Sequence, residues 1–316
     1  MTPRRLALAM LLALALAGST ASHAQSPMGA FCGTRPKPPR RYAHVVWIWM
    51  ENHSYGDIVG SPDAPFINSL IAGCGLATNF HNITHVSLPN YIGAVSGLSL
   101  AELQPFLFDC SPSGACSTTA DSIFARVPSW KAYEESMITN CQMTGFVGYA
   151  VRHNPPPYFT SLSGCTTFDV AYTELQTDLD QDTLPAFSFV TPNTVDDMHD
   201  GPDPAAIQAG DLWLQNELPK ILNSAAYQGG TTAVFVTFDE GEGSGFSFGE
   251  DCANNTTDES CHVVTITISP STPPGTVSAR RFNHYSLLKT TLRMLGIRGR
   301  LGKTGSARNM RRRFNL

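Results

Sequence analysis

Two short apolar segments of the chain, residues 44–50 and 232–238, each run directly into a pair of residues with side-chain oxygen atoms. Both segments are rich in β-branched and aromatic residues, which is typical of strands buried in a parallel sheet. Ligands of such sheets bind beyond the carboxyl ends of the strands, so we expect both pairs to lie at one rim. A cluster of such oxygen ligands indicates a metal-dependent active site. The four residues concerned are Glu51, Asn52, Asp239 and Glu240.

From residue 42 onward the chain alternates between segments with strand periodicity and segments with helix periodicity. Such alternation favours a three-layer α/β/α sandwich with a largely parallel central sheet. We therefore expect one α/β domain over residues 42–297, preceded by a surface lead-in over residues 25–41. The predicted strands are residues 44–50, 76–83, 142–148, 185–190, 232–238 and 262–268. The predicted helices are residues 63–72, 89–97, 121–137, 205–224 and 284–296.

The N-terminal residues 1–24 have the features of an export signal. Arg4 and Arg5 form a charged start, residues 6–17 form an apolar stretch, and a small-x-small cleavage site ends at Ala24. A membrane anchor is the alternative, but the stretch is too short to span about 30 Å of hydrocarbon as a helix. No other segment has the sequence of a transmembrane helix. We expect cleavage after Ala24 and a mature protein in the periplasm or outside the cell.

Eight cysteines follow this signal, and none of them forms a C-x-x-C pair, so zinc and thioredoxin-like chemistry are not expected. An even number of cysteines in an oxidising compartment predicts disulfide bonds. Four bonds allow many pairings, and the sequence alone does not choose among them. Because short loops lose little entropy on closing, local pairing is favoured for Cys110–Cys116 and Cys252–Cys261. The remaining cysteines are Cys32, Cys74, Cys141 and Cys165.

The distribution of charge constrains the partners of this chain. All 26 acidic residues lie between Glu51 and Glu259, and only four basic residues lie between Tyr42 and Ala279. Four basic against 26 acidic residues give this body a net charge of −22 when histidine is counted as neutral. Nucleic-acid recognition by so acidic a body is not expected. If the substrate is an anion, bound cations would have to supply the positive charge, with carboxylates as their ligands.

The C-terminal residues 298–316 have the opposite character, with seven Lys or Arg residues and no Asp or Glu. We expect this basic tail to be a solvated, partly disordered end of the chain. The alternative is a weak contact with an anionic surface, such as lipid headgroups or polyanions.

Ser87 lies where a predicted strand gives way to a predicted helix. The position suits the N-cap of the helix, and Pro89 in the first turn is a favoured neighbour. Taken alone, the pattern predicts a capping serine. The alternative is a serine nucleophile, because a metal ion and a helix N-terminus would stabilise its alkoxide, and the N-terminus also attracts a phosphate.

Two further segments bring histidines near polar groups. Residues 196–201 hold three carboxylates and one histidine, which fits either a solvated acidic turn or a set of ligands. His284 begins the last predicted helix, where a lone histidine is more often structural than catalytic.

Five segments together resemble the phosphoesterase family of bacterial acid phosphatases and phospholipases C, within the alkaline phosphatase superfamily. They occur in the order of the family, and the resemblance covers roughly residues 42–297. The chain departs from the family pattern at Tyr55, where phenylalanine is frequent, and at Val86, where proline is frequent. The five segments are residues 51–55, 85–91, 192–193 with 197–201, 237–241 and 283–286.

The resemblance implies an alkaline-phosphatase-like fold and a role for each matched residue. Ser87 would be the nucleophile and also a metal ligand, and His199 or His284 would transfer protons. One divalent cation of unknown identity is expected, and the pattern has room for a second. The other ligands of the first cation would be Glu51, Asn52, Asp239 and Glu240. The residues of the phosphate pocket, or of a second cation site, would be His85, Asn90, Asp197 and Asp200.

The resemblance predicts an exported, metal-dependent hydrolase of phosphate esters that acts through a phosphoserine intermediate. A phospholipase C acting on phosphodiesters is the alternative within the same class. Family phospholipases often carry added C-terminal domains, for which this chain has no room, so the substrate range of an acid phosphatase is favoured. A secreted metal-binding module without catalysis is the alternative from another class, and the presence of Ser87 with all four oxygen ligands argues against it. The expected partner is a small phosphate-ester or phospholipid substrate.

Overall fold

The computed structural model describes residues 31–243, 247–255 and 257–316, and the predicted signal peptide lies outside these residues. Its core is a sheet of eight strands in the order β5-β4-β6-β1-β7-β8-β2-β9. The strands from β5 to β7 run parallel, whereas β8 runs antiparallel to β7 and β2. A smaller sheet pairs β3 with β10. The strands are β1 (His44–Met50), β2 (Gly75–Ala77), β3 (Phe80–His81), β4 (Trp130–Glu134), β5 (Asp169–Ala171), β6 (Phe187–Thr191), β7 (Thr232–Phe238), β8 (Thr265–Ile268), β9 (Thr276–Ser278) and β10 (Phe282–Asn283).

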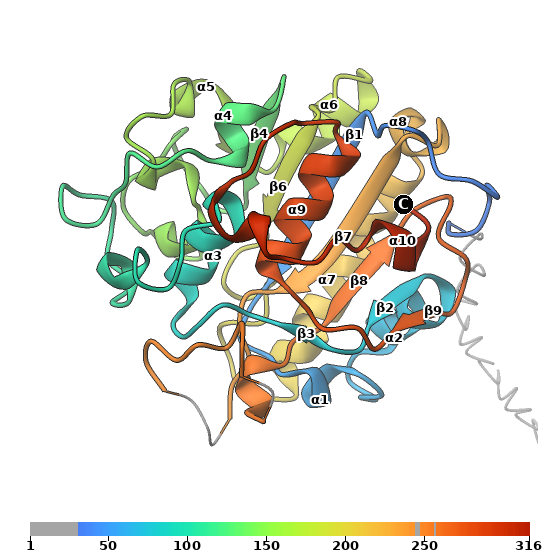
Figure 1. Ribbon diagram of the computed structural model, residues 1–316, viewed down its shortest axis with the longest axis horizontal. Coiled ribbons are helices and arrows are strands. Elements are labelled where there is room, and N and C mark those ends of the chain that lie inside the picture. The colour runs from blue at the N-terminus through green and yellow to red at the C-terminus, as the bar shows by residue number, and fades with distance from the viewer. Residues whose placement is uncertain (1–30, 244–246, 256) are drawn as a thin grey trace, which may run out of the picture.

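Helices cover both faces of the large sheet. In Figure 1, α3 (Ser87–Ser96) and α9 (His284–Met294) lie in front of the sheet, and α7 (Ala205–Leu222) lies behind it. This is the predicted α/β sandwich with a largely parallel sheet. The other α-helices are α1 (Tyr55–Ile58), α2 (Pro65–Gly73), α4 (Ile123–Arg126), α5 (Cys165–Phe168), α6 (Glu174–Asp180), α8 (Ala225–Gln228) and α10 (Arg311–Phe314). The 3-10 helices are η1 (Gln104–Phe106), η2 (Val151–His153), η3 (Pro156–Tyr158), η4 (Glu259–Cys261) and η5 (Gly302–Gly305).

Side chains that alternate along β1 hold the layers together, because successive residues of a strand point to opposite faces of the sheet. Trp47 is fully buried, and its indole nitrogen donates a hydrogen bond to Thr291 Oγ1 of α9 at 2.9 Å. Met50 points to the other face and contacts α7 there. A Cβ atom added to Gly210 of α7 would lie 2.9 Å from the methyl carbon of Met50. The absence of a side chain at Gly210 therefore lets α7 pack closely on the sheet.

Most predicted elements are present, and β1 and β7 have the predicted bounds. Three predictions are wrong. Residues 76–83 do not form one strand, because β2 ends at Ala77 in the large sheet and β3 pairs with β10 in the smaller sheet. Residues 121–137 do not form one helix, because α4 ends before Pro128 and the chain continues as β4, which pairs with β6. Residues 142–148 do not form a strand of the sheet: they lead into a turn in which Phe146 bridges to Tyr149, with Gly148 at a φ of 79° that suits glycine.

The basic tail is folded, which corrects the expectation of a disordered end. It forms η5 and α10, and Met310, Phe314 and Leu316 are buried. The phenyl ring of Phe314 lies 6.2 Å from that of Phe282 between centroids, and its carbonyl oxygen accepts a hydrogen bond from Thr272 Oγ1 at 2.7 Å. Apolar residues spaced between the cations thus anchor the tail, while the cations themselves stay at the surface.

Four disulfide bonds link all eight cysteines. The predicted local pairs Cys110–Cys116 and Cys252–Cys261 are confirmed. The pairs that the sequence left open are Cys32–Cys74 and Cys141–Cys165. Among the described residues, no helix has the length and apolar character needed to cross a membrane.

Candidate active site

The neighbouring strands β1 and β7 end together, and this places the two predicted acidic pairs side by side. Met50 pairs with Phe238 in the ladder, so Glu51 and Asp239 are the first residues beyond it. Asn52 has a φ of 48°, in the left-handed region that asparagine tolerates. This conformation turns the chain, and the Asn52 amide donates a hydrogen bond to Asp239 Oδ1 at 3.2 Å.

Ser87 joins this rim from the other side as the first residue of α3. Its hydroxyl lies 3.1 Å from Glu51 Oε2 and 3.2 Å from Glu240 Oε1. The side chain of Ser87 does not cap the helix, because Asp109 Oδ1 accepts the hydrogen bond of the Leu88 amide at 2.9 Å. Ser87 therefore holds its hydroxyl among carboxylates and does not serve as the helix cap.

The carboxylates at this rim are buried, and their charges are not compensated by lysines or arginines in contact with them. Burial raises the pKa values of Glu51 and Glu240 well above their ordinary range, and the charge of Asp239 raises both further. Burial also raises the pKa of Asp239 to about 7. Like charges crowded in a desolvated site disfavour joint ionisation unless a cation is bound.

The residues at the rim fit a divalent cation. Glu51, Asp239, Glu240, Asn52 and Ser87 offer oxygen atoms, which are the ligands that hard cations prefer. The second carboxylate oxygen of Asp239, Oδ2, is buried and has no hydrogen-bond partner among the described residues. A buried and unpartnered carboxylate oxygen is costly in the protein alone, and coordination of a cation would satisfy it.

His153 is a site residue that the sequence analysis missed. Its Nε2 lies 3.3 Å from Glu51 Oε2 and its Nδ1 lies 3.2 Å from Asp197 Oδ2. Its ring stacks on Tyr91, whose hydroxyl donates a short hydrogen bond to Glu51 Oε1. Burial lowers the pKa of His153 well below its ordinary value, which leaves a neutral ring able to act as a ligand.

Glu51, His153 and Asp197 together form a second candidate cation group. Each offers one ligand atom, and these three atoms lie within 4.8 Å of one another. All three residues are buried. Glu51 belongs to both groups, so the structure places the two candidate cation positions next to each other.

A hollow of about 300 Å³ opens over Ser87 and gives the rim access to solvent. Arg152 lines it, and its Nη2 donates a hydrogen bond to His199 Nε2 at 2.8 Å. On the other side of the His199 ring, Nδ1 lies 2.9 Å from Asp200 Oδ1. A phosphate group in the hollow would therefore meet the hydroxyl of Ser87, the guanidinium of Arg152 and the imidazole of His199.

Three of the predicted residues lie behind the hollow rather than in its lining. His284 is fully buried, and its Nε2 lies 2.7 Å from the carbonyl oxygen of Asp239. His85 is also fully buried, with Nδ1 2.5 Å from Glu240 Oε2. Asn90 accepts hydrogen bonds from the backbone at Ile83 and Thr84, which shapes the turn before Ser87. These three side chains support the ligands or the turn and do not face a substrate.

The loop of residues 196–201 contributes through three side chains. Asp197 is buried and accepts a hydrogen bond from the His199 amide at 2.8 Å, in addition to its contact with His153. Asp200 is exposed and bonds to His199 and, at 2.6 Å, to Thr194 Oγ1. The loop thus positions a buried candidate ligand and a histidine of the hollow.

Comparison with known proteins identifies a family and relatives of this chain. The chain matches the phosphoesterase family over residues 61–298, a segment that contains Ser87, Asp239 and Glu240 and begins after Glu51. It is 29% identical over 270 residues to the phosphatidylinositol-3-phosphatase of Mycobacterium tuberculosis, covering 85% of this chain and 80% of that protein. It is also 29% identical over 208 residues to an acid phosphatase of Aspergillus fumigatus, covering 61% of this chain and 43% of that protein. The chain therefore spans less than half the length of this fungal relative.

Solved structures show the same fold. A protein of the alkaline phosphatase superfamily from Vibrio parahaemolyticus matches with a TM-score of 0.54 and 15% identity, over 90% of this chain and 73% of that chain. The phosphonate monoester hydrolase of Agrobacterium radiobacter matches with a TM-score of 0.50 and 13% identity, over 86% of this chain and 77% of that chain. At these identities the likeness concerns the fold alone.

Proposed function

The chain belongs to the phosphoesterase family, and from this premise we propose that it is an exported, metal-dependent phosphatase that acts through a phosphoserine intermediate on Ser87. The observation that carries the proposal is the position of the Ser87 hydroxyl, which lies within 3.2 Å of both Glu51 and Glu240 at the base of an open hollow. A metal-binding module without catalysis could use the Ser87 hydroxyl as a ligand, but it would not need the open hollow above it.

A divalent cation held by Glu51, Asn52, Ser87, Asp239 and Glu240 would neutralise the buried carboxylates, lower the pKa of the serine hydroxyl and polarise the phosphoryl oxygens. The buried and unpartnered Asp239 Oδ2 supports this assignment. The group of Glu51, His153 and Asp197 supports the proposal of a second cation site next to the first.

The residues of the hollow divide the chemistry of the first step among them. Ser87 Oγ forms a bond to phosphorus as the bond from phosphorus to the leaving alcohol breaks, and its proton is lost to solvent as the hydroxyl ionises. Arg152 binds the phosphoryl oxygens with its guanidinium group, which suits planar recognition of phosphate. His199 Nε2 accepts a hydrogen bond from Arg152 in the free protein; once Arg152 binds the phosphoryl oxygens, Nε2 takes up a proton from solvent and passes it to the leaving alcohol, while Nδ1 stays bonded to Asp200.

The second step releases phosphate and restores the enzyme. Water attacks the phosphoserine, the bond between phosphorus and Ser87 Oγ breaks, and His199 takes the proton of the water. The serine oxygen regains a proton from solvent. His153, His85 and His284 remain in place throughout, because they hold the carboxyl groups and the backbone around the site.

Phosphomonoesters are the proposed substrates, because the relatives with the longest matches are named as phosphatases. These are the Mycobacterium tuberculosis protein and the phosphate-repressible acid phosphatase of Penicillium chrysogenum, to which this chain is 29% identical over 265 residues. Export is supported by the N-terminal signal sequence and by the four disulfide bonds.

Hydrolysis by the purified mature chain tests the proposed function. We expect release of phosphate from p-nitrophenyl phosphate, little release from bis-p-nitrophenyl phosphate, and loss of both on chelation with recovery on adding a divalent cation. Faster hydrolysis of the diester would favour the phospholipase C alternative. Full activity after exhaustive chelation would reject the metal-dependent mechanism, and inactivity on both esters with every cation tried would favour a non-catalytic module.

A further inference from the structure

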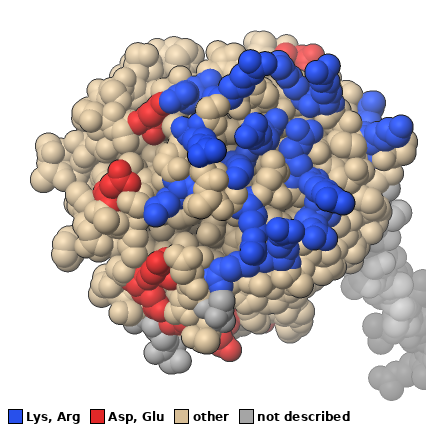
Figure 2. Space-filling view, in the orientation of Figure 1, with Lys and Arg blue, Asp and Glu red and all other residues tan. Residues whose placement is uncertain are grey.

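The C-terminal part of the chain forms a strongly basic face on an otherwise acidic molecule. Residues 280–316 contain eleven Lys or Arg residues and no Asp or Glu. Figure 2 shows Lys and Arg side chains gathered over α9 and the C-terminal segment, with Asp and Glu at the margins of this face. The proposed catalytic chemistry makes no use of these cations.

The cations of this basic face form no ion pair with an Asp or Glu in the part of the chain that the structure describes. The side chains that form hydrogen bonds donate them to backbone carbonyl oxygens. Arg281 donates to the carbonyl oxygen of Ala253, and Lys289 donates to that of Ala307. Like charges gathered without counterions repel one another, so an anionic partner would stabilise this surface.

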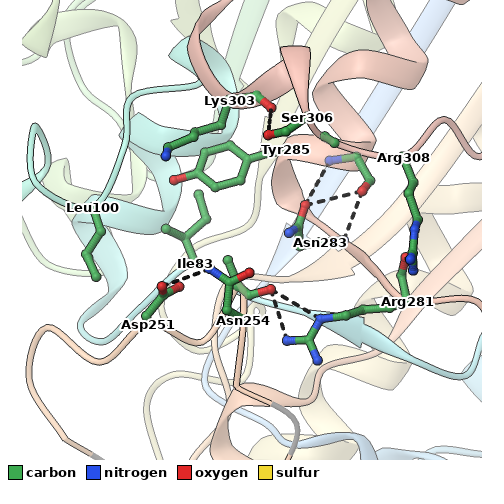
Figure 3. Close-up of a pocket in the computed structure, with 13 residues that line it drawn as sticks. Ile83, Leu100, Asp251, Asn254, Arg281, Asn283, Tyr285, Lys303, Ser306 and Arg308 are labelled. Atoms are coloured by element: carbon green, nitrogen blue, oxygen red, sulfur yellow. Dashed lines mark hydrogen bonds between the residues drawn. The ribbon is translucent and has the colours of Figure 1, made fainter.

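Two neighbouring hollows concentrate these cations. The first, of about 330 Å³, is lined by Arg281, Lys303 and Arg308, with Asp251 as an acid in its wall, and is shown in Figure 3. Lys303 approaches it from one side, whereas Arg281 and Arg308 lie on the other. The second, of about 600 Å³, is lined by four arginines that include Arg308. Because Arg308 lines both hollows, an array of anionic groups can occupy them together.

We propose that this basic face docks on an anionic phospholipid bilayer, whose phosphate headgroups enter the two hollows. Each Lys or Arg near an anionic membrane contributes about 1 kcal/mol of attraction. The acidic body is repelled by the same surface, so the molecule docks in one orientation. A single-stranded nucleic acid would need exposed aromatic side chains for stacking, whereas all aromatic residues of this segment, Phe282, Tyr285 and Phe314, are buried.

Co-sedimentation with vesicles tests the docking proposal. We expect the mature chain to bind vesicles of mixed phosphatidylglycerol and phosphatidylcholine, to ignore phosphatidylcholine alone, and to be released by high salt. The variant Arg308→Gln/Arg312→Gln should bind about thirtyfold more weakly, as about 1 kcal/mol for each lost cation implies. The matched control Lys131→Gln/Lys220→Gln removes two cations outside the basic face, each of which is paired with an acid, and should bind like the unmodified chain.

The same samples separate docking from catalysis. Both variants should hydrolyse p-nitrophenyl phosphate at the unmodified rate, and an inactive unmodified chain would count against the proposed function without touching the docking proposal. Absence of binding to anionic vesicles, or equal loss of binding in both variants, would overturn docking. Binding of soluble polyphosphate without binding of vesicles would overturn it in favour of a soluble polyanion.

A second inference concerns the surface beside the catalytic hollow, where apolar side chains are exposed. A neighbouring hollow of about 580 Å³ is lined by Phe146 and Val147 and shares Asp109 and Arg152 with the catalytic hollow. Phe146 is 57% exposed and Val147 is 84% exposed, and Phe108, next to Asp109 in the chain, is 85% exposed. Such exposure of grouped apolar side chains next to a polar site is typical of a binding surface.

The turn that carries these side chains is fixed in position. The backbone groups of Phe146 and Tyr149 exchange two hydrogen bonds of 2.9 Å, and Thr194 donates a third to Gly148, also at 2.9 Å. The backbone of this turn is therefore held by hydrogen bonds, while the side chains of Phe146 and Val147 are exposed to solvent. A leaving alcohol that extends from a phosphoryl group on Ser87 past Arg152 would reach this turn.

We infer that the Phe146–Val147 hollow binds the apolar part of the leaving alcohol, so that amphiphilic phosphate monoesters are preferred substrates. This inference rests on the proposed function. In the variant Phe146→Ser/Val147→Ser, kcat/KM for decyl phosphate should fall at least about tenfold, whereas kcat/KM for glycerol phosphate should not change. The control Leu212→Ser/Val277→Ser replaces two comparably exposed apolar residues, 55% and 62% exposed, and should leave both values unchanged.

The two substrates distinguish failure of this inference from failure of the proposed function. Equal kcat/KM for both esters in the unmodified chain, or equal loss for both in the variant, would overturn the apolar subsite and leave the phosphatase proposal standing. Hydrolysis of neither ester would reject the phosphatase proposal, and the subsite would be rejected with it.

Discussion

Ser87 shows how the role of one residue depends on what its neighbours already do. A serine at the start of a helix ordinarily caps it, and the local sequence around Ser87 predicts that role. In the folded chain Asp109 binds the amide of Leu88 instead, and the serine hydroxyl contacts Glu51 and Glu240. The cap comes from a residue 21 positions further along the chain, which no local pattern reveals.

Replacement of Ser87 by alanine tests its role as a nucleophile. We expect Ser87→Ala to fold like the unmodified chain and to lose turnover by at least about a thousandfold, because among the described residues no other hydroxyl contacts Glu240 and could replace it. The measurement is kcat on p-nitrophenyl phosphate together with the thermal midpoint. Ser96→Ala, at the buried end of the same helix, is the control and should keep its kcat. Near-normal turnover in folded Ser87→Ala would remove Ser87 from the mechanism.

His153 is the second residue with a role that can be tested singly. It contacts both Glu51 and Asp197, so His153→Gln should weaken cation binding by about tenfold to a hundredfold, the usual effect of losing a ligand or its support. Titration of the chelated protein with a divalent cation, followed by its thermal midpoint, measures the change. His44→Gln, at the opposite end of β1, should titrate like the unmodified chain. Identical curves for the two variants would exclude His153 from the cation site.

Secondary-structure elements with an uninterrupted apolar sequence can be predicted from the sequence alone. The strands β1 and β7 are apolar over seven residues each, so their bounds, and with them the positions of Glu51 and Asp239, follow directly. β4 could not be predicted, because its sequence Trp-Lys-Ala-Tyr-Glu lies next to a helical segment and becomes a strand through pairing with β6. His153 could not be assigned either, since its neighbours Tyr91 and Asp197 lie far away in the chain.

The shared rim of β1 and β7 makes the stability of the metal-free protein depend on pH. Burial raises the pKa of Asp239 to about 7, against about 3.9 in an unfolded chain. Between these values the folded state holds a proton that the unfolded state lacks, so stability falls as pH rises through this window, by on the order of 4 kcal/mol in total. With a cation bound, the carboxylate is ionised in both states, and this loss disappears.

Thermal midpoints across pH 4.5–7.5, with and without chelator, measure this effect. We expect the chelated sample to lose more stability than the cation-loaded sample as pH rises. Asp169, whose pKa burial raises to about 8, contributes equally to both samples, so the difference between the two curves is the quantity to compare. Parallel curves would mean that no cation binds these carboxylates.

The tail helix α10 supplies another prediction at this scale. Phe314 is fully buried and packs on Phe282, so Phe314→Ala should lower the free energy of unfolding by about 3–5 kcal/mol. Phe108→Ala removes the same atoms from a side chain that is 85% exposed, and it should change the free energy of unfolding little. Denaturant titration of both variants gives the comparison. An unchanged midpoint for Phe314→Ala would show that the tail is not part of the cooperative fold.

In the whole molecule, the acidic and the basic residues lie in separate regions, and the net charge does not reveal this separation. The net charge of −5 combines an acidic body, which holds the catalytic carboxylates, with a basic C-terminal face. The sequence shows this separation along the chain, but the folded tail places the cations on one surface through the buried residues Met310, Phe314 and Leu316. The acidic body accounts for the need for cations at the site, and the basic face is free to meet a different partner.

Trapping the phosphoserine tests the central claim most directly. The cation-loaded chain is mixed with a phosphomonoester, quenched in acid within the first turnovers, digested and examined by mass spectrometry. We expect a peptide that contains Ser87 and carries one phosphoryl group, and we expect none from Ser87→Ala or from chelated samples. Sustained phosphate release with no phosphoryl group on Ser87 at any quench time, together with activity in Ser87→Ala, would exclude Ser87 as the nucleophile.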